Sequence, residues 1–163
     1  MRTRMVTFGV FAALALIFSY VEGLIPIQLG IPGVKLGLAN LVVVIALYKV
    51  SWKETFLLAI VRVLLAGFLF GNLFSIVYSL SGSLVSLAVM MGLKRSGRFS
   101  VIGVSIAGGT AHNIGQLAVA MLVLESSSII YYAPMLLVAG VLTGMVIGIA
   151  ANEMLKRLVK INM

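Results

Sequence analysis

The stretch Thr55 to Gly71, TFLLAIVRVLLAGFLFG, is apolar almost throughout and contains one charged residue, Arg62. A helix needs about 20 mostly apolar residues to cross a bilayer (range about 17–25), so the stretch predicts a membrane-spanning helix. Arg62 lies about eight positions inside it, roughly 12 Å from the nearer end. A charge at this depth costs at least ~2.5–3.5 kcal/mol on insertion scales. We expect Arg62 to face a bundle interior, either fixed by helix ends and hydroxyls or as an anion-binding or gating residue.

Five further apolar stretches flank this one. They are Met5–Val21, Leu36–Tyr48, Asn72–Leu93, Val101–Leu124 and Pro134–Leu155. The chain has 163 residues, of which 62% are hydrophobic and 10% charged, whereas a soluble domain carries roughly 25% charged residues. The sequence therefore predicts an all-α membrane protein, a single domain of six transmembrane helices over residues 1–163, with membrane lipid around it.

The basic residues predict how the helices are oriented. Apart from Arg62 and Lys35, all of them fall on one side of the six predicted spans: Arg2, Arg4, Lys49, Lys53, Lys94, Arg95, Arg98, Lys156, Arg157 and Lys160. Basic loops stay in the cytoplasm, so we expect cytoplasmic N and C termini and a multi-pass protein of the plasma membrane. This topology accounts for the net charge of +8, and nucleic acid is not an expected partner.

Polar residues recur at helical spacing in two of the predicted spans. The fourth carries Asn72, Ser75, Ser79, Gly82 and Ser86, and the fifth carries Ser105, Gly109, His112 or Asn113, and Gln116. Steps of three and four residues place side chains on one helix face. Single buried serines usually join helices, but we expect these faces to converge with Arg62 and Asn40 around a polar cavity.

The first outer connection, between Glu22 and Lys35, contains Pro26 and Pro32 and predicts irregular backbone. Irregular apolar backbone in a membrane has to be covered by protein or line a water-filled pocket. We expect this connection to be a lid over a cavity that opens to the outside. His112 is either a core residue or a ligand-binding one. Because the chain has no Cys and no Asp, we expect neither a metal site nor a cofactor.

Small residues spaced four apart predict close helix packing. They are Gly140, Gly144 and Gly148, then Ala107, Ala111 and Gly115, and also Gly9 and Ala13. Such spacing lets helix backbones approach closely in lipid. The contacts are expected either within this chain or, for Gly9 and Ala13 on the first helix, with a partner protein.

Several motifs spread over the chain resemble one known family. They are PGVKLGLAN (Pro32–Asn40), KE followed by RVLL (Lys53–Glu54 and Arg62–Leu65), SLSG (Ser79–Gly82) with Ser86 and Met90, and HNIGQ (His112–Gln116). Together they resemble the Gx transporter family, also labelled heptaprenyl diphosphate synthase component I. That family is similar in size and topology to the S components of energy-coupling factor importers. The resemblance implies an S-component-like bundle that pairs with a transmembrane coupling subunit and two ATPases. Its partner contact would use Gly9 and Ala13, where the usual motif has two alanines.

The predicted function is the capture of a small polar or anionic organic solute, such as a vitamin precursor, for import. The candidate substrate-binding residues are Glu22, Lys35, Asn40, Arg62, Asn72, Ser75, Ser79, His112, Asn113 and Gln116. The alternative is a non-catalytic scaffold or accessory subunit in prenyl diphosphate or quinone synthesis. An enzyme is not expected, because carboxylate clusters that hold magnesium on diphosphate are missing. A secondary transporter is the third interpretation, and no inverted repeat supports it.

Overall fold

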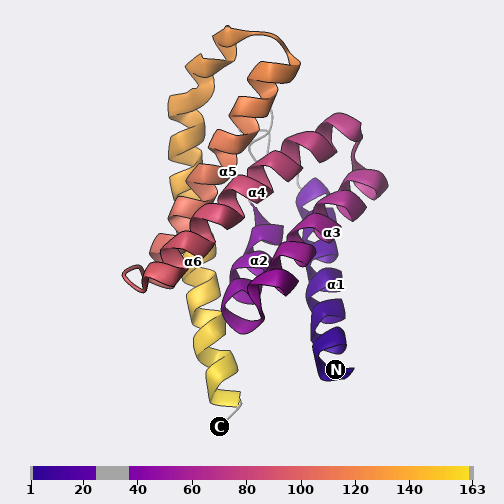
Figure 1. Ribbon diagram of the computed structural model, residues 1–163, viewed down its shortest axis with the longest axis vertical. Helices are drawn as coiled ribbons and strands as arrows, with labels where there is room; N and C mark the ends of the chain where they lie inside the picture. Colours follow the sequence, from indigo (N-terminus) through magenta and orange to yellow (C-terminus); the bar gives the residue numbers. More distant parts are fainter. Residues whose placement is uncertain (1, 25–36, 162–163) are drawn as a thin grey trace.

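The computed structural model describes residues 2–24 and 37–161, and within them the chain is all-α, with no strand (Figure 1). The elements are α1 (Arg2–Leu24), α2 (Leu38–Lys49), α3 (Trp52–Phe70), α4 (Leu73–Ser96), α5 (Val101–Val123), the short 3-10 helix η1 (Ser127–Tyr132) and α6 (Ala133–Ile161). Each of the six predicted helices is therefore present, and the expectation of an all-α fold is confirmed.

Four segments in the described part of the chain are long and apolar enough to cross a membrane. They are Met5–Leu24 of α1, α4, α5, and Ser127–Leu158, which joins η1 to α6. The apolar helix α2 has 12 residues, about 18 Å at 1.5 Å per residue, which is shorter than a hydrocarbon core of about 30 Å. Helix α3, with Lys53, Glu54 and Arg62 in its sequence, is not among the four.

The helices include polar residues that the hydropathy pattern assigns to loops, and at α3 the reason is a helix cap. Ser51 and Glu54 form a capping box, in which the Ser51 side chain accepts the Glu54 N–H and the Glu54 carboxylate accepts the Ser51 N–H. Trp52 to Glu54 consequently form the first turn of α3 instead of a loop. Glu22 likewise lies in α1, and most of the expected polar loop before α6 is η1. The expected lid, with Pro26, Pro32 and Lys35, lies outside the described residues.

The beginning of α1 and the end of α6 lie at the same end of the bundle (Figure 1). The α2–α3 and α4–α5 connections lie toward that end as well, and they are flanked by the basic residues Lys49, Lys53, Lys94, Arg95 and Arg98. The α3–α4 turn and the α5–α6 connection lie toward the opposite end. Most of the basic residues at helix ends therefore lie toward the end of the bundle that carries the two chain termini.

Helices α5 and α6 pack along a stripe of glycines. A Cβ atom on Gly144 would lie 2.7 Å from the Ile106 Cα, and one on Gly148 would lie 2.8 Å from the Ile102 Cα. Side chains at these positions would force the backbones apart, so the glycines allow the contact. The stripe in α6 therefore serves packing within the chain. Gly9 of α1 is exposed, and a Cβ atom added to it would have no neighbour within 4 Å in the described part of the chain.

Helix α2 forms the centre of the hydrophobic core. Its buried residues Val43, Val44, Ile45 and Leu47 pack with Leu87 and Met90 of α4, Val104 of α5, and Ile147 and Ala151 of α6. On the other side, Val42 and Ala46 pack with Ala15 of α1 and Leu58 of α3. A short helix buried in this way begins inside the bundle, and the space beside its N-terminus is the cavity described next.

Candidate functional site

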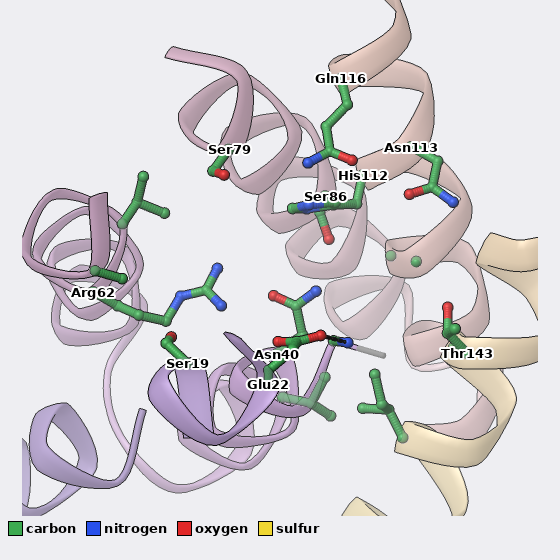
Figure 2. A pocket seen from close by; sticks show the side chains of 18 of the residues that line it. Ser19, Glu22, Asn40, Arg62, Ser79, Ser86, His112, Asn113, Gln116 and Thr143 are labelled. Atoms are coloured by element: carbon green, nitrogen blue, oxygen red, sulfur yellow. Dashed lines mark hydrogen bonds between the residues drawn. The ribbon is translucent and has the colours of Figure 1, made fainter. Parts of the chain in front are cut away.

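A cavity of about 270 Å³ lies between the helices, and all six α-helices contribute to its wall. Its polar and charged lining residues are Ser19, Glu22, Asn40, Arg62, Ser75, Ser79, Ser86, Ser105, His112, Asn113, Gln116 and Thr143 (Figure 2). Typical small-molecule pockets enclose about 300–1,000 Å³. The volume is therefore just below that range, and the wall includes polar and charged groups from every α-helix of this apolar chain.

Arg62 is the most buried charge in this wall, with 8% of its surface exposed. It lies near the middle of α3, and its guanidinium points into the cavity (Figure 2). Its Nη2 donates to the Ser83 Oγ of α4 at 3.1 Å, while its buried Nε has no hydrogen-bond partner in the described part of the chain. A guanidinium has five N–H donors, and here the terminal nitrogens point toward the cavity while Nε is enclosed by the chain (Figure 2).

The burial of Arg62 confirms the expectation that it faces the bundle interior. Leaving a buried donor unsatisfied costs about 1–3 kcal/mol, and more for a charged group. Arg62 therefore combines the two properties of a binding residue for an anionic group: a fixed positive charge and an open donor.

Glu22 joins α1 to α2. Its carboxylate accepts the N–H of Gly37, the residue that precedes the first turn of α2. The backbone of Gly37 is in the left-handed helical region, with φ of 74°, a conformation that glycine adopts more readily than other residues. An acidic group at a helix N-terminus is stabilised by the helix dipole. Glu22 thus has a structural role at α2 and also lines the cavity.

The amides and hydroxyls predicted to converge do so. Asn40 of α2, Ser75 and Ser79 of α4, and His112, Asn113 and Gln116 of α5 all line the cavity. His112 lies against α4, where a Cβ atom on Gly82 would be 3.0 Å from its Cε1. Asn113 is partly committed to the fold, because its Nδ2 donates to the Leu136 carbonyl of α6 at 2.7 Å.

Three of the predicted residues, one of them substrate-binding and two partner-docking, do not line the cavity. Asn72 does not line the cavity: it is the N-cap of α4, and its Oδ1 accepts the Ser75 N–H at 2.8 Å. Its role in substrate binding stays a prediction, and the structure gives the side chain a capping role, because an asparagine at this position satisfies the first turn of its own helix. Gly9 and Ala13 lie exposed on α1, away from the cavity. Lys35 lies outside the described residues.

The sequence analysis missed two lining hydroxyls, Ser19 of α1 and Thr143 of α6. Each hydroxyl donates a hydrogen bond to the carbonyl oxygen four residues earlier in its own helix. Ser19 donates to Ala15 at 2.9 Å, and Thr143 donates to Ala139 at 2.8 Å. One signal was present for Ser19, since it precedes Glu22 by three residues and shares its helix face. Thr143 stands alone among apolar and small residues, and no pattern pointed to it.

The described residues contain no group of three or more His, Cys, Asp or Glu side chains that could hold a metal ion. The lining offers instead one guanidinium, one carboxylate, one imidazole, several amides and several hydroxyls. Groups of this kind can bind a polar organic solute by charge and hydrogen bonds.

Comparison with known proteins identifies one family. The family model described as heptaprenyl diphosphate synthase component I matches residues 11–154. This range runs from α1 into α6 and includes every residue that lines the cavity. No curated protein matches the chain, and no solved structure does.

Proposed function

The chain belongs to the heptaprenyl diphosphate synthase component I family, and we propose that it is a substrate-binding membrane subunit of a small-molecule importer. In this proposal it captures a small polar organic solute from outside the cell, in the cavity between its helices. The chain itself performs no chemistry on the solute.

The observation that carries the proposal is Arg62. A charge buried inside an apolar bundle with an unpartnered Nε is expensive to keep. An anionic group of the solute at the terminal guanidinium nitrogens, which point toward the cavity, would offset this cost. Asn40, Ser79 and Gln116 line the same cavity and suit the polar remainder of such a solute.

The proposal includes six membrane spans with both termini in the cytoplasm. The two chain termini lie at the same end of the bundle, and the connections with most of the basic residues lie toward that end (Figure 1). This arrangement supports the orientation. Helix α2, which neighbouring helices bury, would by itself cross part of the hydrocarbon core, and α3 would cross with apolar side chains such as Phe56, Leu57 and Leu65 exposed to lipid. In this arrangement the entire chain is one membrane domain of the plasma membrane.

An importer subunit of this kind needs an energy-coupling partner, because the sequence has no phosphate-binding loop for ATP. We assign the contact with a transmembrane coupling subunit to the outer face of α1. Gly9 and Ala13 are exposed there, beside the exposed apolar side chains of Met5, Val6 and Val10. Small residues on an exposed helix face permit the close approach of a second helix.

The second candidate is an accessory subunit beside a prenyl diphosphate synthase, and the description of the family favours it. The volume of the cavity argues against a prenyl-binding role for this site. A heptaprenyl chain is larger than most drug-sized ligands, whose pockets enclose about 300–1,000 Å³, while this polar cavity encloses about 270 Å³. An accessory role would therefore use the outer surface.

The test is solute capture by the purified protein. Wild type and the variant Arg62→Gln, in detergent, are incubated with an extract of polar metabolites and washed, and the retained solutes are identified by mass spectrometry. We expect wild type to retain a solute and Arg62→Gln to bind it about 10- to 100-fold more weakly, since a hydrogen bond to a charged group contributes about 1.5–3 kcal/mol.

The matched control is Arg95→Gln, which removes an exposed arginine at the end of α4 and should leave retention unchanged. Retention of nothing by wild type, or equal retention by both arginine variants, contradicts the proposal. Copurification of a prenyltransferase without any ATPase would favour the accessory subunit.

A further inference from the structure

We infer that the solute is a compact zwitterion, with an anionic group at Arg62 and an ammonium or similar cationic group at Glu22. The inference rests on the proposed solute-binding function and adds the charge pattern of the substrate. It departs from the simpler expectation of a net anion, which takes only Arg62 into account.

The described wall of the cavity carries two full charges of opposite sign. Arg62 comes from α3 and Glu22 from the last turn of α1, and both side chains project toward the same space (Figure 2). Glu22 is near enough to act on Arg62 electrostatically. Nevertheless, no ion pair joins these two described residues, so the cavity holds its two charges separated.

Each of the two charged groups keeps capacity for a ligand. The terminal guanidinium nitrogens of Arg62 point toward the cavity (Figure 2), and in the described part of the chain they make one hydrogen bond, from Nη2 to the Ser83 Oγ. The Glu22 carboxylate accepts the Gly37 N–H through Oε1 and also lines the cavity. A carboxylate has about four acceptor positions. Both groups therefore have unfilled positions, of opposite character.

The pair selects by charge. A solute with a net negative charge would gain at Arg62 but be repelled by Glu22, and a simple amine would meet the reverse problem. In a buried site such repulsion is poorly screened. A zwitterion places an opposite charge beside each group, so both charges become paired when it binds.

The remaining wall limits the size and polarity of the skeleton. With about 270 Å³ available, the site suits a solute smaller than a typical drug-sized ligand. The side-chain amides of Asn40, on α2, and Gln116, on α5, also line the cavity (Figure 2). They offer donors and acceptors to polar groups on the skeleton.

The experiment uses matched sets of small molecules. The twenty common amino acids serve as zwitterions, and each is compared with its deaminated carboxylic acid and its decarboxylated amine. Binding to wild type in detergent is measured by thermal shift and calorimetry. We expect at least one zwitterion to bind tenfold or more tightly than both of its matched analogues.

The variant Glu22→Gln keeps an oxygen that can accept the Gly37 N–H and removes the negative charge. It should weaken binding of the zwitterion about tenfold while the matched acid binds as well as before or better. The control Glu153→Gln changes an exposed glutamate at the other end of the chain, 55% exposed and paired with Lys156 at 2.7 Å. It should leave both affinities unchanged.

Two results overturn the inference: a matched acid that binds wild type as tightly as its zwitterion, or a Glu22→Gln variant that weakens both alike. An anionic or neutral solute retained from the metabolite extract in an Arg62-dependent way would leave the proposed function standing and refute the zwitterion. If neither the panel nor the extract contains a solute that binds, the proposed function fails together with it.

Discussion

At the scale of single residues, the polar side chains around the cavity divide by what satisfies them. Asn113 donates to the Leu136 carbonyl, and Ser19 and Thr143 bond to their own helices. Gln116, 4% exposed, has no hydrogen bond to another residue in the described part of the chain and lines the cavity. A polar group that the chain satisfies stabilises the fold, whereas one directed to the cavity is available to a ligand.

This division predicts opposite effects for two neighbouring substitutions in α5. Asn113→Ala should lower the free energy of unfolding by about 0.5–1.5 kcal/mol, because it removes a partly buried hydrogen bond between helices, and should change solute affinity little. Gln116→Ala should weaken solute binding about 2- to 10-fold, the worth of one neutral hydrogen bond, with little effect on stability. Thermal unfolding and calorimetry on each variant measure both quantities, and the reverse pattern would refute the division.

At the scale of helices, backbone contact between α5 and its neighbours gives the cavity its wall. Gly144 brings α6 against Ile106, and Gly115 brings α4 against α5, since a Cβ there would lie 3.0 Å from the Ser81 carbonyl oxygen. Such contacts hold helices together where lipid removes the hydrophobic driving force between them. The outer face of α1 shows the opposite condition, because a Cβ atom on Gly9 would touch no other part of the described chain.

The contrast predicts that one substitution has different consequences at two glycines. Gly144→Val should push α6 away from α5, because its Cβ would lie 2.7 Å from the Ile106 Cα. Overpacking of this kind costs typically about 1–3 kcal/mol. Gly9→Val should leave stability unchanged. Melting temperatures in detergent and the homogeneity of the protein on size exclusion are the measurements, and an equal loss at both positions would contradict the packing assignment.

At the scale of the whole molecule, the helix ends sort by charge. The ends near the two termini carry Lys49, Lys53, Lys94, Arg95 and Arg98, and the opposite end has η1 with its exposed tyrosines, Tyr131 and Tyr132. Basic residues favour the cytoplasmic side, and exposed aromatic rings favour a membrane interface. This distribution favours the proposed orientation, with both chain termini in the cytoplasm.

The orientation is testable because the chain has no cysteine of its own. Single variants Ser96→Cys, at the end of α4, and Ser128→Cys, in η1, each introduce one exposed thiol. A membrane-impermeant maleimide applied to intact cells should label Ser128→Cys and not Ser96→Cys, while permeabilised cells should allow both. Labelling of Ser96→Cys in intact cells would reverse the proposed topology.

Much of the architecture followed from local sequence. Hydropathy predicted six helices, and the position of Arg62 in an apolar stretch predicted its burial, because a charge in such a helix has few other places to go. The three- and four-residue spacing of polar positions in α4 and α5 predicted two faces, and both faces supply residues to the cavity. These are properties of one helix at a time, and a short window of sequence contains them.

Only the tertiary structure decided what each polar group does. It made Asn72 a helix cap, joined Asn113 to Leu136, brought Glu22 to the N-terminus of α2, and added Ser19 and Thr143 to the cavity. It also showed that the glycines of α6 pack within the chain while Gly9 stays exposed. Except for the cap at Asn72, which depends on where α4 begins, these outcomes depend on contacts between helices. No periodicity within a single helix encodes which neighbour it will meet.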